Sequence, residues 1–370
     1  MTVYLMAGGG TAGHVNPLLA TADRLREREP EAEVLVLGTV EGIEARLVPQ
    51  RGYELVTVPR LPFPRRPNAD AVRFPARWKA SIELTRGILR DRGVDAVVGF
   101  GGYAAAPAYA AAHREGLPLV IHEANARPGI ANRYGARLTR RVGTVFAGTR
   151  IRGGRVVGLP LRREIEELDR FVARPAAIES LGLEAGRPTL LVTGGSLGAR
   201  RLNEGISGAV DAVLGAGWQV LHITGDRAPV DDPGLRDYHL MPYCDRMDLA
   251  FAAADLAVSR AGSATVSELA ALGIPAVFVP YAVGNGEQAL NAREAVDAGG
   301  ALLVADADFD ADWVRGPFLR LLDDPALVAD MAARIAATGR RDGADRLVDL
   351  IQEAVAGPAG ASSARSASDR

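Results

Sequence analysis

The chain has 370 residues, 48% of them hydrophobic, and a formal net charge of -2. This length suits two domains of ordinary size, and the apolar fraction is sufficient to fill two cores. The near-neutral charge argues against a general nucleic-acid-binding protein, which needs an excess of positive surface charge, so we expect no nucleic-acid partner.

Cys244 is the only cysteine of the sequence. It excludes an intrachain disulfide and a cysteine-based metal site, and it favours a cytoplasmic location. Met1 leads directly into a strand-like run that lacks the charged and apolar regions of a secretory signal, so we expect no secretion. The longest uncharged stretch, 96–112, contains glycines and a proline, which favours a strand, a loop and a helix over a membrane span.

Two glycine-rich stretches stand at similar places in the two halves of the chain. The sequence GGGTAGH at 8–14 follows the apolar run 3–7, and GGSLGAR at 194–200 follows the apolar run 189–193. Each leads into a helical pattern. A glycine loop between a buried strand and a helix start lets the backbone N–H groups and the helix dipole approach a phosphate. The sequence therefore predicts two similar phosphate-handling domains with a cleft between them.

Short apolar runs without polar alternation recur along both halves, which is typical of parallel strands covered on both faces. They lie at 34–37, 96–99 and 119–122 in the first half and at 220–223, 256–258 and 276–279 in the second. A helical spacing of apolar residues follows the first glycine loop at Val15, Leu18, Leu19, Ala22 and Leu25. These patterns predict an α/β fold throughout.

The domain boundary is expected near 157–160, where glycine and proline interrupt the pattern before a short helix at 163–168. The residues after Gly357 are low in apolar bulk, which is typical of disorder. We therefore expect an N-terminal domain at 1–158, a C-terminal domain at 163–340, a closing helix at 341–356 and a disordered tail at 357–370.

The first glycine loop has the G-x-G-x-x-G spacing of a dinucleotide-binding site, from Gly8 to Gly13. A dehydrogenase also needs an acidic residue at the end of the second strand to hold the ribose. Here Leu37 is followed by glycine and threonine, and Glu41 lies in the next loop. Because the dehydrogenase alternative also leaves the second glycine loop and His14 unexplained, we disfavour it.

His14 directly follows the last glycine of this loop, where a side chain faces whatever the loop binds. Thr11 and Asn16 cluster around the same turn. The position favours a general base, since imidazole exchanges protons near neutral pH. The alternative is a histidine that caps or packs against the start of a helix.

A second group of polar residues follows two further apolar runs. It comprises Gly101, Gly102 and Tyr103 after one run, and the segments 122–125 and 128–132 after the next. The carboxyl ends of parallel strands are where open α/β sheets bind ligands. Ordinary turns would explain the glycines, but they explain Glu123 and Asn125 less well.

In the second half, residues 260–268 lead from a strand into a helix. The pair Thr265 and Glu268 fits a capping box, in which Glu268 only satisfies the helix N-terminus. Alternatively, Glu268 accepts hydrogen bonds from two ribose hydroxyls while the helix start faces a diphosphate. The residues alone leave both possibilities open. The repeated D-x-D spacing at 306–312 suits a divalent cation, but a solvated loop and helix start explains it better.

Five of these blocks together resemble the MurG family, the lipid-linked N-acetylglucosaminyltransferases of peptidoglycan synthesis. The blocks are 9–17, 101–103, 122–125, 194–200 and 265–268, in the order and spacing of that family. The resemblance implies a GT-B fold, in which two Rossmann-like domains face each other across a cleft. It also implies transfer of N-acetylglucosamine from UDP-N-acetylglucosamine to the C4 hydroxyl of undecaprenyl-diphospho-muramoylpentapeptide, with inversion. The UDP-sugar is then a substrate, and no cofactor or metal is required.

The implied displacement needs a base for the acceptor hydroxyl and stabilisation of the departing UDP. The resemblance makes His14 the base, supported by Glu123 or Asn125, with Glu268 on the ribose and the backbone around Cys244 on the uracil. The implied donor positions are Thr11, Ala12, Gly13, Asn125, Arg162, Ser196, Cys244, Ser263, Ala264, Thr265, Glu268 and Gln288. The implied acceptor positions are Gly13, His14, Gly101, Gly102, Tyr103 and Asn132.

Between residues 59 and 92 large apolar side chains alternate with basic ones. The apolar set is Leu61, Phe63, Phe74 and Trp78, and the basic set is Arg60, Arg65, Arg66, Arg73, Arg77 and Lys79. This composition suits an anionic membrane surface, although a solvated loop with a few core anchors explains it equally well. A lipid-linked acceptor favours the first explanation.

The resemblance thus implies a peripheral protein on the cytoplasmic face of the cell membrane, with cell-wall and division proteins as possible partners. Two alternatives for the function stay open at this stage. One is a different GT-B enzyme, such as a glycolipid glycosyltransferase or a UDP-sugar epimerase. The other is a non-catalytic scaffold for cell-wall synthesis.

Overall fold

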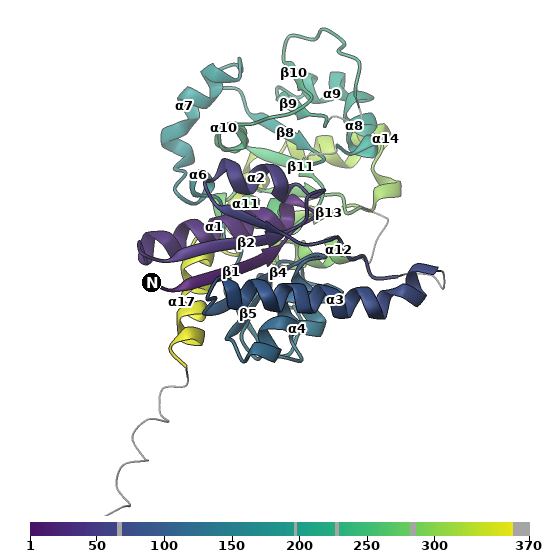
Figure 1. Cartoon of the computed structure of the whole chain (residues 1–370). Coiled ribbons are helices and arrows are strands. Elements are labelled where there is room, and N and C mark those ends of the chain that lie inside the picture. Colours follow the sequence, from purple (N-terminus) through teal and green to yellow (C-terminus); the bar gives the residue numbers. More distant parts are fainter. Residues whose placement is uncertain (65–68, 196–197, 226–228, 282–285, 358–370) are drawn as a thin grey trace, which may run out of the picture. The chain divides into compact units, whose positions relative to one another are not determined.

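The computed structural model describes residues 1–64, 69–195, 198–225, 229–281 and 286–357 of the chain. It consists of two compact units (Figure 1). The first unit comprises Met1–Leu161 and Asp342–Arg370, and the second comprises Arg162–Arg341. The chain therefore leaves the first unit once and returns to it. Of the predicted tail at 357–370, all but Gly357 lies outside the described residues.

The first unit is built on a parallel seven-stranded sheet in the order β3-β2-β1-β4-β5-β6-β7. Its strands are β1 (Val3–Gly8), β2 (Glu33–Gly38), β3 (Glu54–Thr57), β4 (Ala96–Gly101), β5 (Leu119–Glu123), β6 (Val142–Thr144) and β7 (Gly154–Val156). The central strand β1 pairs with β2 on one side and β4 on the other. The strand order reverses there, and in open α/β sheets ligands bind outside the strand ends at such a reversal.

The helices of the first unit cover both faces of this sheet. They are α1 (Ala12–Arg28), α2 (Glu44–Gln50), α3 (Ala69–Asp91), α4 (Ala105–Glu115), α5 (Ile130–Gly135) and α17 (Gly343–Val355). Tyr4 and Met6 of β1 pack into a core with α1 and α17, whereas Leu5 packs into a second core with α3 and α4. This division follows from the two-residue period of a strand. The apolar spacing predicted after the first glycine loop is confirmed, because its five residues are buried in α1.

The helix α17 lies beside α1 and is fixed to it by ion pairs (Figure 1). Arg24 Nη1 lies 2.5 Å from Asp345 Oδ2, and Arg28 Nη1 lies 2.6 Å from Asp349 Oδ1. Leu347 and Ile351 of the same helix are fully buried in the core beneath. The expected closing helix is therefore an integral part of the first unit.

The second unit repeats the plan with a parallel six-stranded sheet in the order β10-β9-β8-β11-β12-β13. Its strands are β8 (Thr189–Thr193), β9 (Gln219–Ile223), β10 (Tyr238–Met241), β11 (Leu256–Ser259), β12 (Ala276–Phe278) and β13 (Ala301–Leu303). The order again reverses beside the first strand of the unit, between β8 and β11. The prediction of an α/β fold with two Rossmann-like domains is thus confirmed.

Helices also surround the second sheet. They are α6 (Arg163–Glu166), α7 (Arg170–Ser180), α8 (Arg200–Ser207), α9 (Val210–Gly215), α10 (Met247–Ala253), α11 (Ser263–Leu272), α12 (Glu287–Asn291), α13 (Arg293–Asp297), α14 (Ala311–Trp313), α15 (Leu319–Leu322) and α16 (Pro325–Ala336), with a 3-10 turn at Asp306–Asp308 and a π-helix at Val314–Phe318. Within the described part of the chain, no helix has the length and hydrophobicity needed to span a membrane.

Each sheet contains one buried histidine. His122 of β5 donates from Nε2 to the carbonyl of Gly158 at 3.2 Å. His222 of β9 lies 2.7 Å from the hydroxyl of Tyr238 and 3.1 Å from Oδ1 of Asn203. Burial lowers the pKa of each imidazole from 6.5 to about 4. Both side chains are therefore neutral at neutral pH.

These histidines make the stability of each unit sensitive to acid. Below pH 6.5 the unfolded chain takes up protons on them, whereas the native chain does so only near pH 4. The unfolding free energy should fall by about 3 kcal/mol per histidine across this interval. Denaturant unfolding at a series of pH values should show that the unfolding free energy depends less steeply on pH in His122→Gln and His222→Gln than in the wild type. The exposed His113→Gln is the matched control, and an unchanged slope in both buried variants would contradict this prediction.

Candidate active site

The first glycine loop joins β1 to α1, and His14 lies in the first turn of that helix. The loop runs from Gly8 to the N-cap residue Thr11, and Gly10 has a φ of +88°, which favours glycine. The Nδ1 of His14 lies 3.1 Å from the carbonyl oxygen of Gly9 and 3.3 Å from Oγ1 of Thr11. A carbonyl oxygen only accepts hydrogen bonds, so Nδ1 carries the proton of the neutral ring. The Nε2 of His14 is then free to accept one.

The loop that follows β4 approaches this first loop backbone to backbone. A Cβ on Gly102 would lie 2.5 Å from the carbonyl oxygen of Gly9, a distance that no side chain tolerates. A Cβ on Gly101 would lie 3.3 Å from Nε2 of His14 and 3.5 Å from Nδ2 of Asn132. The structure therefore brings together four of the predicted acceptor residues, at the sheet reversal between β1 and β4.

The fifth of these residues, Tyr103, is partly exposed beside them. Its ring lies 4.7 Å from the guanidinium carbon of Arg60, which is a cation–π contact. The sixth, Gly13, lies in the first turn of α1. All six predicted acceptor positions thus belong to the ends of β1, β4 and β5, the loops that follow these strands and the helices after them.

Glu123 organises the loop after β5. Its side chain is only 2% exposed. Oε1 accepts from the backbone N–H of Asn125 at 2.9 Å, and Oε2 accepts from Gly129 N–H and from Nδ2 of Asn132, each at 2.9 Å. The carboxylate therefore fixes the loop and orients Asn132.

Tyr109 of α4 completes this network, and the sequence analysis did not identify it. Its hydroxyl donates to Oδ1 of Asn132 at 2.7 Å and accepts from the N–H of Gly101 at 3.3 Å. Burial raises the pKa of the phenol, so it stays a neutral donor. The sequence did contain a signal, because Tyr109 is a single aromatic residue in an alanine-rich helix.

The structure describes the contacts of His14 and of its expected partner Glu123. Nδ1 of His14 faces the Gly9 carbonyl, and the carboxylate of Glu123 binds its own loop and Nδ2 of Asn132. Support of His14 by Glu123 or Asn125 stays a prediction. The alternative of a histidine that caps or packs against the start of a helix survives only in its second form. Thr11 occupies the N-cap position of α1, and His14 lies inside the first turn with its ring turned back to Gly9 and Thr11.

The acidic residue after β2 that contacts the glycine loop is Glu44, whereas Glu41 is exposed. Glu44 is 1% exposed, and its carboxylate accepts from the backbone N–H of Gly10 at 2.9 Å. It therefore faces inward to the glycine loop, whereas a ribose-binding carboxylate faces the ligand. This geometry removes the remaining support for a dinucleotide site.

In the second unit, Glu268 and Arg162 form a partly buried ion pair. Arg162 Nη2 donates to Oε1 of Glu268 at 3.2 Å, and Nε of Arg162 is buried without a hydrogen-bond partner among the described residues. Burial raises the pKa of the Glu268 carboxyl, and the positive charge of Arg162 opposes this rise only in part. The capping-box explanation of Glu268 is wrong, because it requires Thr265 as the N-cap. Helix α11 already begins at Ser263, two residues earlier, and its N-cap is Gly262.

The other predicted donor residues of the second unit follow the carboxyl ends of its strands. Cys244 is half-buried after β10, and Ser263, Ala264 and Thr265 form the first turn of α11 after β11. Gln288 lies in α12 after β12, where its Oε1 accepts from the N–H of Tyr281 at 2.8 Å. Parallel strands end at one edge of a sheet, so these residues share that edge. Ser196 lies outside the described residues.

The aspartate run at 306–312 is used in local structure. Asp306 Oδ1 accepts from Nη1 of Arg260 at 2.5 Å, and Asp310 caps α14 by accepting from the N–H of Trp313 at 2.8 Å. The loop and helix start that we favoured for this run is therefore what the structure contains.

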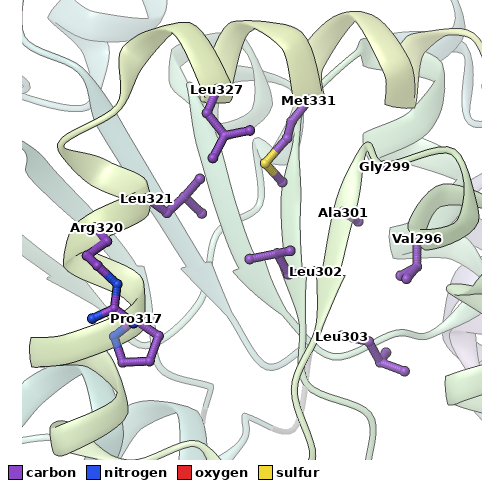
Figure 2. Close-up of a pocket in the computed structure, with 10 residues that line it drawn as sticks. All are labelled: Val296, Gly299, Ala301, Leu302, Leu303, Pro317, Arg320, Leu321, Leu327 and Met331. Carbon is purple, nitrogen blue, oxygen red and sulfur yellow. The ribbon is translucent and has the colours of Figure 1, made fainter.

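An apolar pocket of the second unit lies away from the predicted site. Figure 2 shows it between β13 and the helices α15 and α16, with Leu302 pointing toward Leu321 and Met331. Arg320 supplies its single charged side chain. None of the predicted donor or acceptor residues lines this pocket, so it does not belong to the candidate active site.

Comparison with known proteins identifies the class. Residues 4–144 match the N-terminal domain of glycosyltransferase family 28, and residues 189–347 match its C-terminal domain. The first match covers six of the seven strands of the first sheet, all but β7, and the second covers the whole second sheet. The chain is therefore a two-domain family 28 glycosyltransferase.

Full-length relatives narrow this class to one family. A protein from Leifsonia xyli subsp. xyli is 64% identical over 352 residues, covering 95% of this chain and 98% of that protein. One from Clavibacter michiganensis subsp. michiganensis is 60% identical over 358 residues, covering 96% and 97%. Both are named UDP-N-acetylglucosamine--N-acetylmuramyl-(pentapeptide) pyrophosphoryl-undecaprenol N-acetylglucosamine transferase.

A solved structure agrees with these relatives. The crystal structure of Acinetobacter baumannii MurG superposes with a TM-score of 0.77 at 28% identity, covering 95% of this chain and 100% of that one. The chain belongs to the MurG family. The resemblance found in the five sequence blocks and the expected GT-B fold are confirmed, and the epimerase and the non-catalytic scaffold lose their support.

Proposed function

We propose that this chain transfers N-acetylglucosamine from UDP-N-acetylglucosamine to the C4 hydroxyl of the muramoyl unit of undecaprenyl-diphospho-muramoylpentapeptide, converting lipid I to lipid II. Relatives that span nearly the whole chain carry the name of this reaction. The geometric observation that carries the proposal is His14, whose Nδ1 is bound to the Gly9 carbonyl so that Nε2 is left as a proton acceptor. The product serves peptidoglycan synthesis and hence cell shape and division.

His14 acts as the general base in this scheme. Its Nε2 takes the proton of the acceptor C4 hydroxyl while the oxygen attacks the anomeric carbon of the donor sugar. The bond from that carbon to the UDP oxygen breaks on the opposite face, so the displacement inverts the configuration. The acceptor diphosphate binds near Gly101 and Gly102, where glycine lets the backbone approach closely.

The second unit holds UDP. The first turn of α11 offers backbone N–H groups and the positive end of the helix dipole to the diphosphate, because its N-cap residue Gly262 has no side chain to occupy them. Glu268 accepts hydrogen bonds from the ribose, and Arg162 beside it adds positive charge. UDP-N-acetylglucosamine is a substrate here, and the proposed reaction uses no cofactor.

A transfer assay tests this function directly. The purified full chain, given radiolabelled UDP-N-acetylglucosamine and the lipid-linked acceptor, should form the labelled disaccharide lipid. His14→Ala should lower transfer by about 10²-fold to 10⁴-fold, because the hydroxyl proton has no acceptor, yet it should bind UDP normally by calorimetry. The exposed His113→Ala is the control. Absence of product with the wild-type chain would overturn the function, and near-normal turnover of His14→Ala would remove His14 from the mechanism.

The raised pKa of Glu268 predicts a pH dependence of UDP binding. Only the ionised carboxylate accepts hydrogen bonds from both ribose hydroxyls, and burial favours its protonated form. UDP affinity should therefore fall as the pH drops, beginning above the ordinary glutamate pKa of about 4.3.

The matching variant is Glu268→Gln, which should bind UDP about tenfold more weakly at neutral pH. In calorimetric titrations between pH 7.5 and 5, its affinity for UDP should change less with pH than that of the wild type. Glu179→Gln, an exposed substitution in the same unit, serves as the control. If Glu268→Gln binds UDP as tightly as the wild type, Glu268 does not hold the ribose.

The first unit also binds the cytoplasmic face of the cell membrane in this proposal. Phe63 is 59% exposed and Val72 is 82% exposed, although the neighbouring Leu61 is buried and serves as a core anchor. The ring of Phe74 lies 5.4 Å from that of Phe63 and 5.9 Å from that of Trp78.

Exposed cations lie on the same segment of the chain as these apolar residues. Arg73, Arg77 and Lys79 are exposed on α3, whereas Arg65 and Arg66 lie outside the described residues. Aromatic side chains between cations suit an anionic lipid surface. Contact with cell-wall and division proteins stays a prediction from the sequence resemblance.

Vesicle sedimentation tests the membrane surface. The wild-type chain should bind vesicles that contain phosphatidylglycerol more tightly than vesicles of phosphatidylcholine alone. The double variant Phe63→Ser and Val72→Ser should bind them about tenfold more weakly, because it removes buried apolar area. Phe171→Ser, which changes a side chain that is 89% exposed in the second unit, is the matched control. Equal losses in the two variants, or no lipid preference in the wild type, would contradict the assignment.

A further inference from the structure

Glu44 lies in an enclosure made of glycine backbone. It begins α2, directly after the turn that follows β2, and it is 1% exposed. A Cβ on Gly9 would lie 2.3 Å from its Oε1, one on Gly38 2.6 Å from its Cγ, and one on Gly42 2.0 Å from its Oε2. Three glycines thus leave the room that this carboxylate fills, so the enclosure and the carboxylate fit each other.

Hydrogen bonds saturate the carboxylate inside this enclosure. Oε2 accepts from the N–H of Gly10 at 2.9 Å, and Oε1 accepts from the N–H and the hydroxyl of Thr39 at 3.0 and 2.9 Å. Burial alone would raise the pKa of the Glu44 carboxyl, but these hydrogen bonds outweigh burial and lower it. Glu44 is therefore a buried anion at neutral pH, held by three donors.

The bond to Gly10 links Glu44 to His14 through one peptide group. The N–H of Gly10 and the C=O of Gly9 belong to the same amide. Glu44 accepts from its N–H end at 2.9 Å, and Nδ1 of His14 donates to its C=O end at 3.1 Å. An anion at the N–H end polarises the amide and strengthens its oxygen as an acceptor. The peptide thus connects a carboxylate to an imidazole, as a direct hydrogen bond does in other base-assisted sites.

We propose that Glu44 is a positioning residue that acts through the Gly9–Gly10 peptide to keep His14 in the tautomer with Nδ1 protonated and Nε2 free. This inference rests on the proposed role of His14 as the base. A peptide between two glycines rotates readily, and its rotation would turn an N–H toward Nδ1 of His14. Glu44 prevents that rotation from one side of the loop. Gly102, whose Cβ would lie 2.5 Å from the Gly9 oxygen, closes the other side.

The sharpest variant is Glu44→Gln, which keeps the size of the side chain. An amide has one acceptor oxygen and one N–H₂ group. Thr39 offers two donors and Gly10 offers one, which favours the orientation with the amide oxygen toward Thr39. The N–H₂ group then faces the N–H of Gly10, and two donors oppose each other. The variant therefore breaks the connection to His14 without opening a cavity.

Two controls separate positioning from general stability. Thr39→Val removes one bond to Glu44 but leaves the bond from Gly10. Glu41→Gln changes an exposed carboxylate three positions earlier in the same segment. In Glu44→Gln, kcat for transfer should fall by about tenfold to 100-fold, since the base is misplaced, while KM for UDP-N-acetylglucosamine changes less than about twofold. Both controls should keep kcat within about twofold of the wild type.

Nitrogen NMR of the histidine rings in the full chain gives a readout that does not depend on activity. The signals of His14, assigned by their loss in His14→Gln, should show a protonated Nδ1 in the wild type and in both controls. In Glu44→Gln this preference should be lost.

The outcomes distinguish the inference from the proposed function. A wild-type His14 with Nε2 protonated overturns the inference, whether or not Glu44→Gln folds. A folded Glu44→Gln with wild-type kcat and an unchanged His14 tautomer also overturns it, and the proposed function stands. If the wild type makes no lipid product, the proposed function fails, and the NMR spectra still decide whether Glu44 controls the tautomer.

Discussion

The candidate site depends on one close approach, in which the backbone of Gly102 packs against the carbonyl of Gly9. Since β1 and β4 are neighbours at the reversal of the strand order, the loops that leave them meet at the same edge of the sheet. A side chain at Gly102 would force the loops apart. With glycine there, the ring of His14 lies beside Gly101 and Asn132.

Two buried carboxylates stabilise the loops of the candidate site. Glu44 holds the loop after β1, and Glu123 holds the loop after β5, each through hydrogen bonds that involve backbone N–H groups. A buried charge is costly unless donors surround it, and irregular loops have many N–H groups without partners. Each carboxylate therefore solves two problems at once. The acid supplies an acceptor to the loop, and the loop compensates the charge of the acid.

Much of the fold could be predicted from the sequence because it depends on local patterns. Unbroken apolar runs identified β1, β2, β4, β5, β8, β9, β11 and β12, but they did not identify β3, β6, β7 and β10. The first glycine stretch marked the turn into α1. The motif blocks then gave the family. The start of α11 was not predictable in the same way, since Thr265 and Glu268 match a capping box but the helix already begins at Ser263.

Tertiary contacts account for the other differences. Neither the inward turn of Glu44 nor the bridge that Tyr109 makes between Gly101 and Asn132 follows from spacing along the chain. Both depend on which strands are neighbours, and a single sequence does not report that. The support expected for His14 from Glu123 stays a prediction. The loop after β1 meets the loop after β4 through glycine backbone, and Glu123 binds the loop after β5 and Asn132.

Because α17 belongs to the first unit, that unit is completed last when the chain is synthesised. The ribosome makes residues 1–161, then the whole of the second unit, and only afterwards the helix that covers the β1 core beside α1. The second unit has all its elements while the first still exposes the apolar surface that Leu347 and Ile351 will bury. The unit that carries His14 is thus the last to be completed, and a chain interrupted before residue 342 lacks its final helix.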